Sequence, residues 1–337
     1  MIIFRHNGKS PVCDKRQCSC HVTRGSTIFS GLLREWEPGM KHIISIRDLD
    51  RPFIDELINH ANHIASQHFN ANSLSDKILA LLFFEPSTRT RMSFEAAMAR
   101  LGGTSISVGS IEASSMAKGE TLADTIRVVS GYADAIVLRH PKEGAARLAS
   151  EFASVPVINA GDGAGQHPSQ TLLDLYTIQQ SLPLDGIDVG MIGDLRYGRT
   201  AHSLAYALSL YRSRIHVISP KGLELPPALI GELRDRGTEV IEHEHIEDII
   251  RELDVLYVTR IQRERFPDSA SYFDVSSSYK ITTDLLEGVR SHLIVLHPLP
   301  RVDEIEPEVD DLPYARYFEQ SRNGVPVRMA MLQEVLK

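Results

Sequence analysis

The sequence predicts an α/β fold with two doubly wound domains, each a parallel sheet flanked by helices. Three observations lead to this prediction. Short apolar runs of strand length alternate along the chain with segments whose apolar residues recur at helical spacing. With 337 residues, the chain has room for two domains that each bury a core. No period of about 20–50 residues repeats, which argues against a solenoid.

Apolar spacing predicts the elements of the first half in order. A helix is expected over Ser45–Ala65, with Pro52 in its first turn or at a break within it. The elements that follow are a strand at Ile78–Phe84, a helix from Arg89 to Leu101, a Gly/Ser-rich passage at Gly102–Gly119, a helix at Thr121–Tyr132, strands at Ala135–Leu138 and Val155–Ile158, and a helix at Thr171–Gln180.

The second half repeats the alternation of strands and helices. Its predicted elements are a strand at Val189–Ile192, a helix ending near Leu210, strands at Ile215–Ile218, Val255–Val258 and Leu293–Leu296, and a closing helix at Val327–Leu336.

Composition excludes several classes of protein. The chain is 42% hydrophobic and 24% charged, as in ordinary soluble globular proteins. Its net charge of −8 argues against nucleic-acid binding through a basic surface. No apolar run approaches the roughly 18 residues that span a bilayer, and no secretory signal peptide opens the chain. We therefore expect no nucleic-acid or membrane partner.

Residues 1–39 differ from the rest of the chain. They contain all three cysteines, Cys13, Cys18 and Cys20, and show no clear periodicity. Three interpretations stay open: an extension that is disordered or not native, with Met40 as the start; a short targeting segment; or a metal site that also uses His21, although the spacing matches no common zinc pattern. We expect the first. A folded body without cysteine needs no disulfide, which suits the cytoplasm.

The stretch from Ile78 to Leu101 is the strongest local signal of a ligand. A buried strand, a proline turn and a helix follow one another, with Ser87 and Thr88 as N-cap residues. Hydroxyl groups, Arg89, Arg91 and free backbone N–H groups then gather at one helix N-terminus, which is suited to phosphate. The alternative is an ordinary capped helix with surface arginines.

Polar residues also follow the other predicted strands. Six strand runs end on such residues: Ser87–Arg89, Arg139, His167, Arg199, Arg260 and His297–Arg301. Ligands of open α/β sheets bind outside the carboxyl ends of the strands, so this placement predicts a pocket for a small polyanion. The arginines can hold two anions through their planar forks. His167 is a candidate for polarising a carbonyl or moving a proton; the alternative is a structural histidine that caps the next helix.

Other candidate motifs are weaker. The loop Gly193–Gly198 lacks the spacing of a dinucleotide-binding turn, and no loop has the spacing of a nucleoside-triphosphate site. The run Glu242–His245 suggests a metal, but the surrounding charge favours a solvated loop.

Four motifs together resemble the aspartate/ornithine carbamoyltransferase family over roughly residues 40–337. They are Ser-Thr-Arg-Thr at 87–90, Arg-His-Pro at 139–141, His-Pro-x-Gln at 167–170 and His-Pro-Leu-Pro-Arg at 297–301. Two more, Gly-Asp-Leu-x-x-Gly-Arg-Thr at 193–200 and Thr-Arg-x-Gln at 259–262, resemble the catalytic chains of the aspartate branch. The Ser-Met-Gly and His-Cys-Leu-Pro motifs typical of the ornithine branch are absent, since residue 298 is proline.

The resemblance implies an enzyme with its active site between two domains. Residues 40–168 plus about 320–337 would bind carbamoyl phosphate, and residues 169–319 would bind aspartate. The implied reaction transfers the carbamoyl group to the amino group of L-aspartate, giving N-carbamoyl-L-aspartate and phosphate early in pyrimidine (UMP) synthesis. It needs no metal or organic cofactor. A carbamoyltransferase with another amine acceptor and a non-catalytic paralogue remain as alternatives, though the intact motifs argue against the latter.

The resemblance also assigns roles to residues. Ser87, Thr88, Arg89 and Thr90 would bind the phosphate; Arg139, His167, Gln170 and the backbone carbonyls of Leu299 and Pro300 the carbamoyl end; Arg199, Arg260 and Gln262 the aspartate carboxylates. Lys118, with Ser114 or Ser115, would reach into the site of a neighbouring subunit of a homotrimer. Glu85 and Arg265 would pair across the domains. Arg139, His167 and Thr90 would stabilise the oxyanion and Arg89 the leaving phosphate. Separate regulatory chains are left open.

Overall fold

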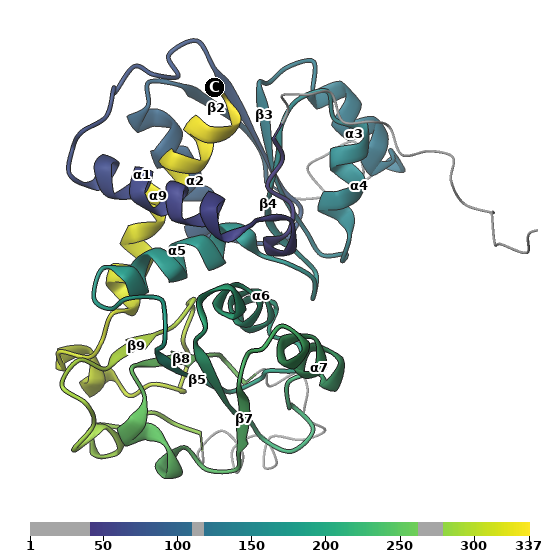
Figure 1. Ribbon diagram of the computed structural model, residues 1–337. Helices are drawn as coiled ribbons and strands as arrows, with labels where there is room; N and C mark the ends of the chain where they lie inside the picture. Colours follow the sequence, from purple (N-terminus) through teal and green to yellow (C-terminus); the bar gives the residue numbers. More distant parts are fainter. Residues whose placement is uncertain (1–40, 110–117, 262–278) are drawn as a thin grey trace, which may run out of the picture. The chain divides into compact units, whose positions relative to one another are not determined.

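The computed structural model describes residues 41–109, 118–261 and 279–337, all within the compact unit Gly39–Lys337 (Figure 1). Several residues with predicted roles lie outside the described residues: Cys13, Cys18, Cys20, His21, Ser114, Ser115, Gln262 and Arg265. No helix among the described residues is both long enough and apolar enough to cross a membrane.

Among the described residues, the first sheet has four parallel strands in the order β2-β1-β3-β4. Helices cover both of its faces: side chains such as Leu79 and Leu81 pack with one set of helices, whereas Ala80 and Leu82 pack with the other. This is the doubly wound arrangement. The elements are β1 (Ile78–Phe83), β2 (Thr104–Val108), β3 (Ala135–His140), β4 (Val157–Asp162), α1 (Arg51–Ala65), α2 (Thr88–Arg100), α3 (Leu122–Val129), α4 (Ala145–Phe152) and α5 (Pro168–Gln179).

The second sheet has five parallel strands within the described part of the chain, in the order β7-β6-β5-β8-β9. Its elements are β5 (Asp188–Ile192), β6 (Arg214–Ile218), β7 (Val240–His243), β8 (Val255–Val258), β9 (Ile294–Leu296), α6 (Arg199–Leu208) and α7 (Pro227–Asp235). Short 3-10 helices lie at Ile46–Asp48, Ser209–Tyr211, Ile246–Asp248, Ile250–Glu252, Asp284–Leu286 and Pro307–Asp311. The predicted fold class, two parallel sheets flanked by helices, is confirmed.

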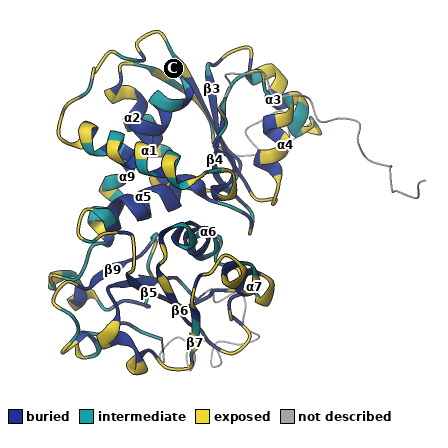
Figure 2. Cartoon of the chain, viewed as in Figure 1, coloured by how far each residue is buried: buried dark blue, intermediate teal, exposed yellow. Residues whose placement is uncertain are grey.

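Two helices connect the sheets. The last helix, α9 (Tyr317–Val335), follows the second sheet in sequence but packs beside α1, α2 and α5 (Figure 1). Helix α5 is buried along almost its whole length, and Figure 2 shows most of it in dark blue. Because a helix buried all round has protein on every side, its polar side chains must find partners inside the protein. Gln170 and Asp174 are two such polar residues of α5.

Several elements were missed or misplaced in the sequence-based prediction. Strand β2 lies in the Gly/Ser-rich passage, and α4, α7 and β7 were not predicted. The edge strand β2 was hidden because its residues are half exposed and form no apolar run. Helix α9 begins at Tyr317 rather than Val327 and contains Pro326, a residue that usually disfavours a helix interior. Pro52 lies in the first turn of α1, which Asp50 caps.

The prediction of a solvated loop at Glu242–His245 is only partly correct. Glu242 and His243 end strand β7, while Glu244 and His245 are exposed. The His243 ring stacks on His216 of the neighbouring strand, with the ring centroids 5.2 Å apart. The charge in this run therefore did not exclude a strand, because an edge strand can present charged side chains to water.

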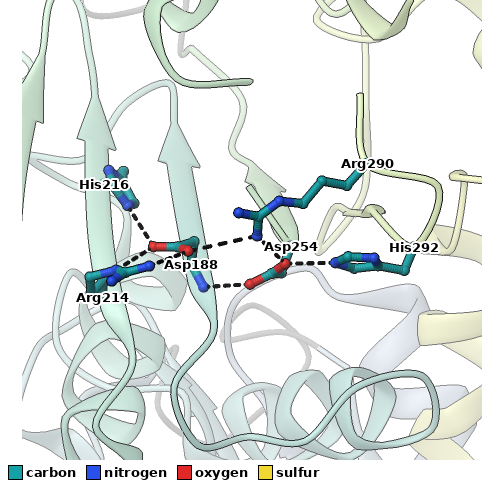
Figure 3. Close-up of polar contacts among 6 residues, drawn as sticks. All are labelled: Asp188, Arg214, His216, Asp254, Arg290 and His292. Atoms are coloured by element: carbon teal, nitrogen blue, oxygen red, sulfur yellow. Dashed lines mark hydrogen bonds and ion pairs between the residues drawn. The ribbon is translucent and has the colours of Figure 1, made fainter. Parts of the chain in front are cut away.

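Charged side chains gather at the amino ends of the second sheet (Figure 3). Asp188 accepts two hydrogen bonds of 2.6 Å from the Arg214 guanidinium and lies 3.1 Å from His216 Nε2. Asp254 lies 2.5 Å from Arg290 Nη1 and 2.7 Å from His292 Nε2. Although burial acts to raise them, hydrogen bonds from these partners and, for Asp254, first from the backbone N–H of Asp188 hold the pKa values of both carboxyls below their usual range.

Candidate active site

A cavity of about 370 Å³ lies at the carboxyl ends of the strands of both sheets. Four arginines line it and no aspartate or glutamate does, counting the part of the chain that the structure describes. An excess of buried positive charge is stabilised by an anionic ligand. The lining comprises Pro86, Ser87, Thr88, Arg89, Thr90, Ser93, Arg139, His167, Gln170, Leu173, Arg199, Thr200, His297, Pro298, Leu299, Pro300, Gln320, Ser321 and Arg328.

The turn from β1 into α2 supplies one wall of the cavity. Ser87 is the N-cap residue of α2, but its hydroxyl makes no capping hydrogen bond. The first N–H groups of a helix have no partner within it, so they and the hydroxyl groups are available to an anion. Arg89 lies at the exposed rim, where partial burial lowers its pKa. Arg91, which the sequence grouped with it, instead approaches Glu95 at 3.6 Å and does not line the cavity.

Glu85 joins one arginine of the first sheet to another that begins a helix beside the second sheet. It accepts hydrogen bonds of 3.0 Å from Arg139 of β3 and of 3.1 and 3.2 Å from Arg199 of α6. Burial, followed by the charge of Arg199, lowers the pKa of Arg139 to about 10, so that it remains charged at neutral pH. Gly161 permits this approach: its φ is +112°, and a Cβ there would lie 3.0–3.3 Å from Arg139, His167 and Arg199.

His167 is buried at the N-cap position of α5. Its ring makes no capping hydrogen bond, and its Nδ1 lies 3.3 Å from the Ser169 hydroxyl. Burial first, and then the charges of Arg139 and Arg199, lower the pKa of His167 well below its usual value. The imidazole is therefore neutral at physiological pH and can donate one hydrogen bond.

A buried carboxylate lies behind Gln170. Asp174 Oδ1 accepts hydrogen bonds of 2.8 Å from Gln170 Nε2 and 2.7 Å from Gln320 Nε2, and Oδ2 accepts one of 3.0 Å from the Tyr257 hydroxyl. Burial raises the pKa of Asp174 to about 6, although these hydrogen bonds act to lower it. The carboxylate is therefore ionised at neutral pH.

Sequence reasoning missed Arg328, Asp174 and Gln320. Arg328 is buried on α9 with its guanidinium 5.1 Å from the Phe94 ring, and burial lowers its pKa to about 10. The sequence could have identified two of them as candidates, because Asp174 and Arg328 are charged residues within the otherwise apolar pattern of a helix. The sequence could not tell which side of those helices faces the cavity.

The segment after β9 presents backbone groups to the cavity. His297 Nε2 lies 2.7 Å from Glu304 Oε1, so this nitrogen carries the proton, and Nδ1 accepts a 2.8 Å hydrogen bond from Leu299 N–H. Leu299 has a φ of +55°, a conformation that costs a leucine energy, and its peptide bond to Pro300 is cis. The backbone around Leu299 is thus held in an uncommon conformation beside the cavity.

The structure gathers most of the predicted site residues in one cavity. Two of those described lie elsewhere: Arg260, half-buried after β8, and Lys118, exposed before α3, are not part of its lining. Gln262 is outside the described residues. The residues that do line it are Ser87, Thr88, Arg89, Thr90, Arg139, His167, Gln170, Arg199, Leu299 and Pro300.

Family models match nearly the whole described chain. Residues 41–180 match the carbamoyl-phosphate-binding domain of the aspartate/ornithine carbamoyltransferases, and residues 185–335 match the Asp/Orn-binding domain of the same family. The chain belongs to this family. Its resemblance to the family, and the implied class of carbamoyltransferase enzymes, are confirmed.

Relatives in the family are similar over their full length. The aspartate carbamoyltransferase catalytic subunits of Methanosphaerula palustris and Methanoculleus marisnigri are each 73% identical, over 88% of this chain and 100% of theirs. The catalytic subunit of M. jannaschii aspartate transcarbamoylase has a TM-score of 0.83 at 54% identity, covering 88% of this chain and 98% of that one. Trypanosoma cruzi aspartate transcarbamoylase in complex with carbamoyl phosphate has a TM-score of 0.83 at 39% identity, covering 89% and 97%.

Proposed function

We propose that this chain transfers the carbamoyl group of carbamoyl phosphate to the amino group of L-aspartate, giving N-carbamoyl-L-aspartate and phosphate. The observation that carries the proposal is the cavity with four arginines and no carboxylate among the described lining, in a chain of this family. Both substrates are anions, and the relatives named above are aspartate carbamoyltransferases. The reaction is an early step of pyrimidine (UMP) synthesis.

The β1–α2 turn takes the phosphate in this proposal. Ser87, Thr88 and Thr90 contribute hydroxyl and backbone N–H donors at the helix N-terminus, and Arg89 contributes a guanidinium at the rim. Charge grows on the phosphate oxygen as the bond to the carbamoyl carbon breaks. Donors fixed in place before the reaction stabilise that charge without reorganisation.

The opposite wall takes the carbamoyl group. The nitrogen of aspartate attacks the carbonyl carbon, the oxygen becomes negatively charged, and the C–O bond to phosphate then breaks. Arg139, neutral His167 and Thr90 donate hydrogen bonds to that oxygen, while Gln170 and the carbonyls of Leu299 and Pro300 accept from the NH₂ group. The phosphate leaves as the attacking nitrogen loses its proton, and the departing phosphate accepts that proton. The reaction needs no side-chain nucleophile. Ser87 would require an adjacent base to act as one, and the motif at residues 87–90 offers none.

Aspartate binds opposite the phosphate in this proposal. Arg199, Arg260 and Gln262 take its carboxylates, with Lys118 and Ser114 or Ser115 supplied by a neighbouring subunit. Arg199 is now bound to Glu85, so a substrate carboxylate exchanges places with that side chain. Holding both reactants in line supplies about 7 kcal/mol or more of the barrier in favourable cases.

The assembly and domain division belong to the same proposal. Residues 40–168 plus about 320–337 form the carbamoyl-phosphate domain, supported by the packing of α9 on α1 and α2, and residues 169–319 form the aspartate domain. The chain forms a cytoplasmic homotrimer with shared active sites. The word subunit in the relatives' names is consistent with separate regulatory chains.

The test is product formation by purified protein from carbamoyl phosphate with aspartate or with ornithine. We expect carbamoyl aspartate and no product with ornithine. If product formed only with another amine, the assignment of the phosphate-binding residues would stand, but the assignment of Arg199 and Arg260 to aspartate would be overturned. No turnover by folded protein with any acceptor would indicate a non-catalytic paralogue.

A further inference from the structure

Gln170 is the side-chain amide that lines the cavity from α5, and its orientation is fixed from behind. Its Nε2 donates to Asp174 Oδ1 at 2.8 Å. An ionised carboxylate only accepts hydrogen bonds, so the NH₂ end of the amide must face Asp174. The amide oxygen makes no hydrogen bond within the described part of the chain. It is the end left for a ligand.

An acceptor is scarce in this cavity. Arginine side chains only donate hydrogen bonds, and the lining contains no carboxylate among the described residues. A ligand NH₂ group only donates, so it needs oxygens such as Gln170 Oε1. If the amide turned by 180°, its NH₂ would face the ligand NH₂, and two donors would meet.

Asp174 also fixes a second part of the cavity wall. Its Oδ1 accepts from Gln320 Nε2 at 2.7 Å, and Gln320 Oε1 accepts from His297 N–H at 2.9 Å. His297 in turn accepts from Leu299 N–H through Nδ1 at 2.8 Å. One buried carboxylate is thus connected to the amide and to the backbone segment that carries the other carbonyl acceptors.

We propose that Asp174 is a positioning residue that directs the amide oxygen of Gln170 toward the carbamoyl NH₂, and so lets the site distinguish carbamoyl phosphate from an acyl phosphate that lacks the NH₂. This inference rests on the proposed function. Asp174 itself does not line the cavity and touches no substrate. Its effect reaches the ligand through Gln170 and, by way of Gln320, through the segment at Leu299.

The experiment compares the dissociation constants of carbamoyl phosphate and acetyl phosphate, in which a methyl group replaces the NH₂. Asp174→Ala frees the Gln170 amide, and we expect the preference for carbamoyl phosphate to fall about tenfold, the effect of about one hydrogen bond. Asp174→Asn retains an oxygen that can accept from both glutamines, with its NH₂ toward the Tyr257 hydroxyl. This variant should keep most of the preference.

Tyr257→Phe is the matched control. It removes the hydrogen bond to Asp174 Oδ2 but leaves Gln170 and Gln320 bound to Oδ1. General loosening of the buried network would lower the preference in this variant as well, and that outcome would overturn the proposal. An unchanged preference in folded Asp174→Ala would do the same.

Two further variants keep the proposal testable if Asp174→Ala does not fold. Asp174→Leu fills the space with a branched side chain that accepts no hydrogen bond and replaces Asp174→Ala if the latter unfolds. Gln170→Leu removes the amide itself, so a wild-type preference in this variant contradicts the proposal whatever the Asp174 variants do. Wild-type protein that forms no carbamoyl aspartate would instead contradict the proposed function, which separates the two failures.

Discussion

Charged side chains gather at both ends of the second sheet, and the two ends differ in how the charges are balanced. At the amino ends, Asp188 and Asp254 are bound by arginines and histidines, as Figure 3 shows. At the carboxyl ends, Arg199 lines a cavity that also contains Arg89, Arg139 and Arg328 and no carboxylate among the described lining. Glu85 satisfies two of these arginines from outside the lining.

The difference separates structural charge from binding charge. A carboxylate with an arginine partner at 2.6 Å accepts its hydrogen bonds from the protein itself, so it needs no ligand to satisfy it. Around the cavity, two arginines share the one carboxylate of Glu85, so an excess of positive charge remains there. This excess positive charge is unfavourable in the free protein and becomes favourable when a substrate anion supplies the missing counter-charge. Mutation and ligand binding can test the contrast between the two ends.

Arg89→Ala should have the largest effect. It removes a donor to the leaving phosphate, and we expect kcat to fall by about 10²- to 10³-fold with little change in the melting temperature, because Arg89 is exposed. Arg91→Ala is the matched control, since Arg91 is on the same helix but approaches Glu95 instead of the cavity. Equal losses in the two variants, measured by steady-state kinetics, would contradict the site.

Asp188→Ala should show the opposite behaviour. The change leaves Arg214 and buried His216 without their carboxylate, and we expect the free energy of unfolding to fall by about 2–3 kcal/mol. Activity per folded molecule should be unchanged. Denaturant unfolding measures the first quantity and steady-state kinetics the second; a loss of kcat without a loss of stability would show that the amino-end cluster is not merely structural.

Inorganic phosphate should stabilise the protein through the cavity. At about ten times its Kd, a ligand of the folded state adds about 1.4 kcal/mol, visible as a rise in melting temperature. We expect this rise in wild-type protein and in Asp188→Ala, and a much smaller one in Arg89→Ala. A rise that is equal in all three proteins would place the phosphate somewhere other than the β1–α2 turn.

The smallest effect concerns protonation of His167. Its folded-state pKa is lowered, so acidification through about pH 6.5 protonates this histidine in the unfolded chain but not in the folded one. The stability it contributes is therefore present above that pH and is lost below it. We expect the His167 ring signals in NMR spectra to stay unchanged as the pH falls through 6.5. A titration near that pH would show that the ring is not enclosed by the arginines.

Much of the fold was visible in the sequence because buried parallel strands are continuous apolar runs. Ile78–Phe84 and Val255–Val258 were found this way, whereas the half-exposed β2 was not, since exposure removes the apolar run. Helix α9 was found only in part, because Pro326 is a helix breaker locally and is tolerated here inside a helix packed against three others.

The sequence alone determined which residues follow the strands, because apolar runs mark the strands. Parallel pairing then brings the carboxyl ends of the strands to the same edge of each sheet. The sequence therefore identified Arg89, Arg139, His167 and Arg199 as cavity residues in advance. Only the tertiary structure decided their partners. That Glu85 lies between Arg139 and Arg199, and that Gln320 and Tyr257 reach Asp174, depends on how the elements pack, and no local pattern encodes contacts between residues so far apart in the chain.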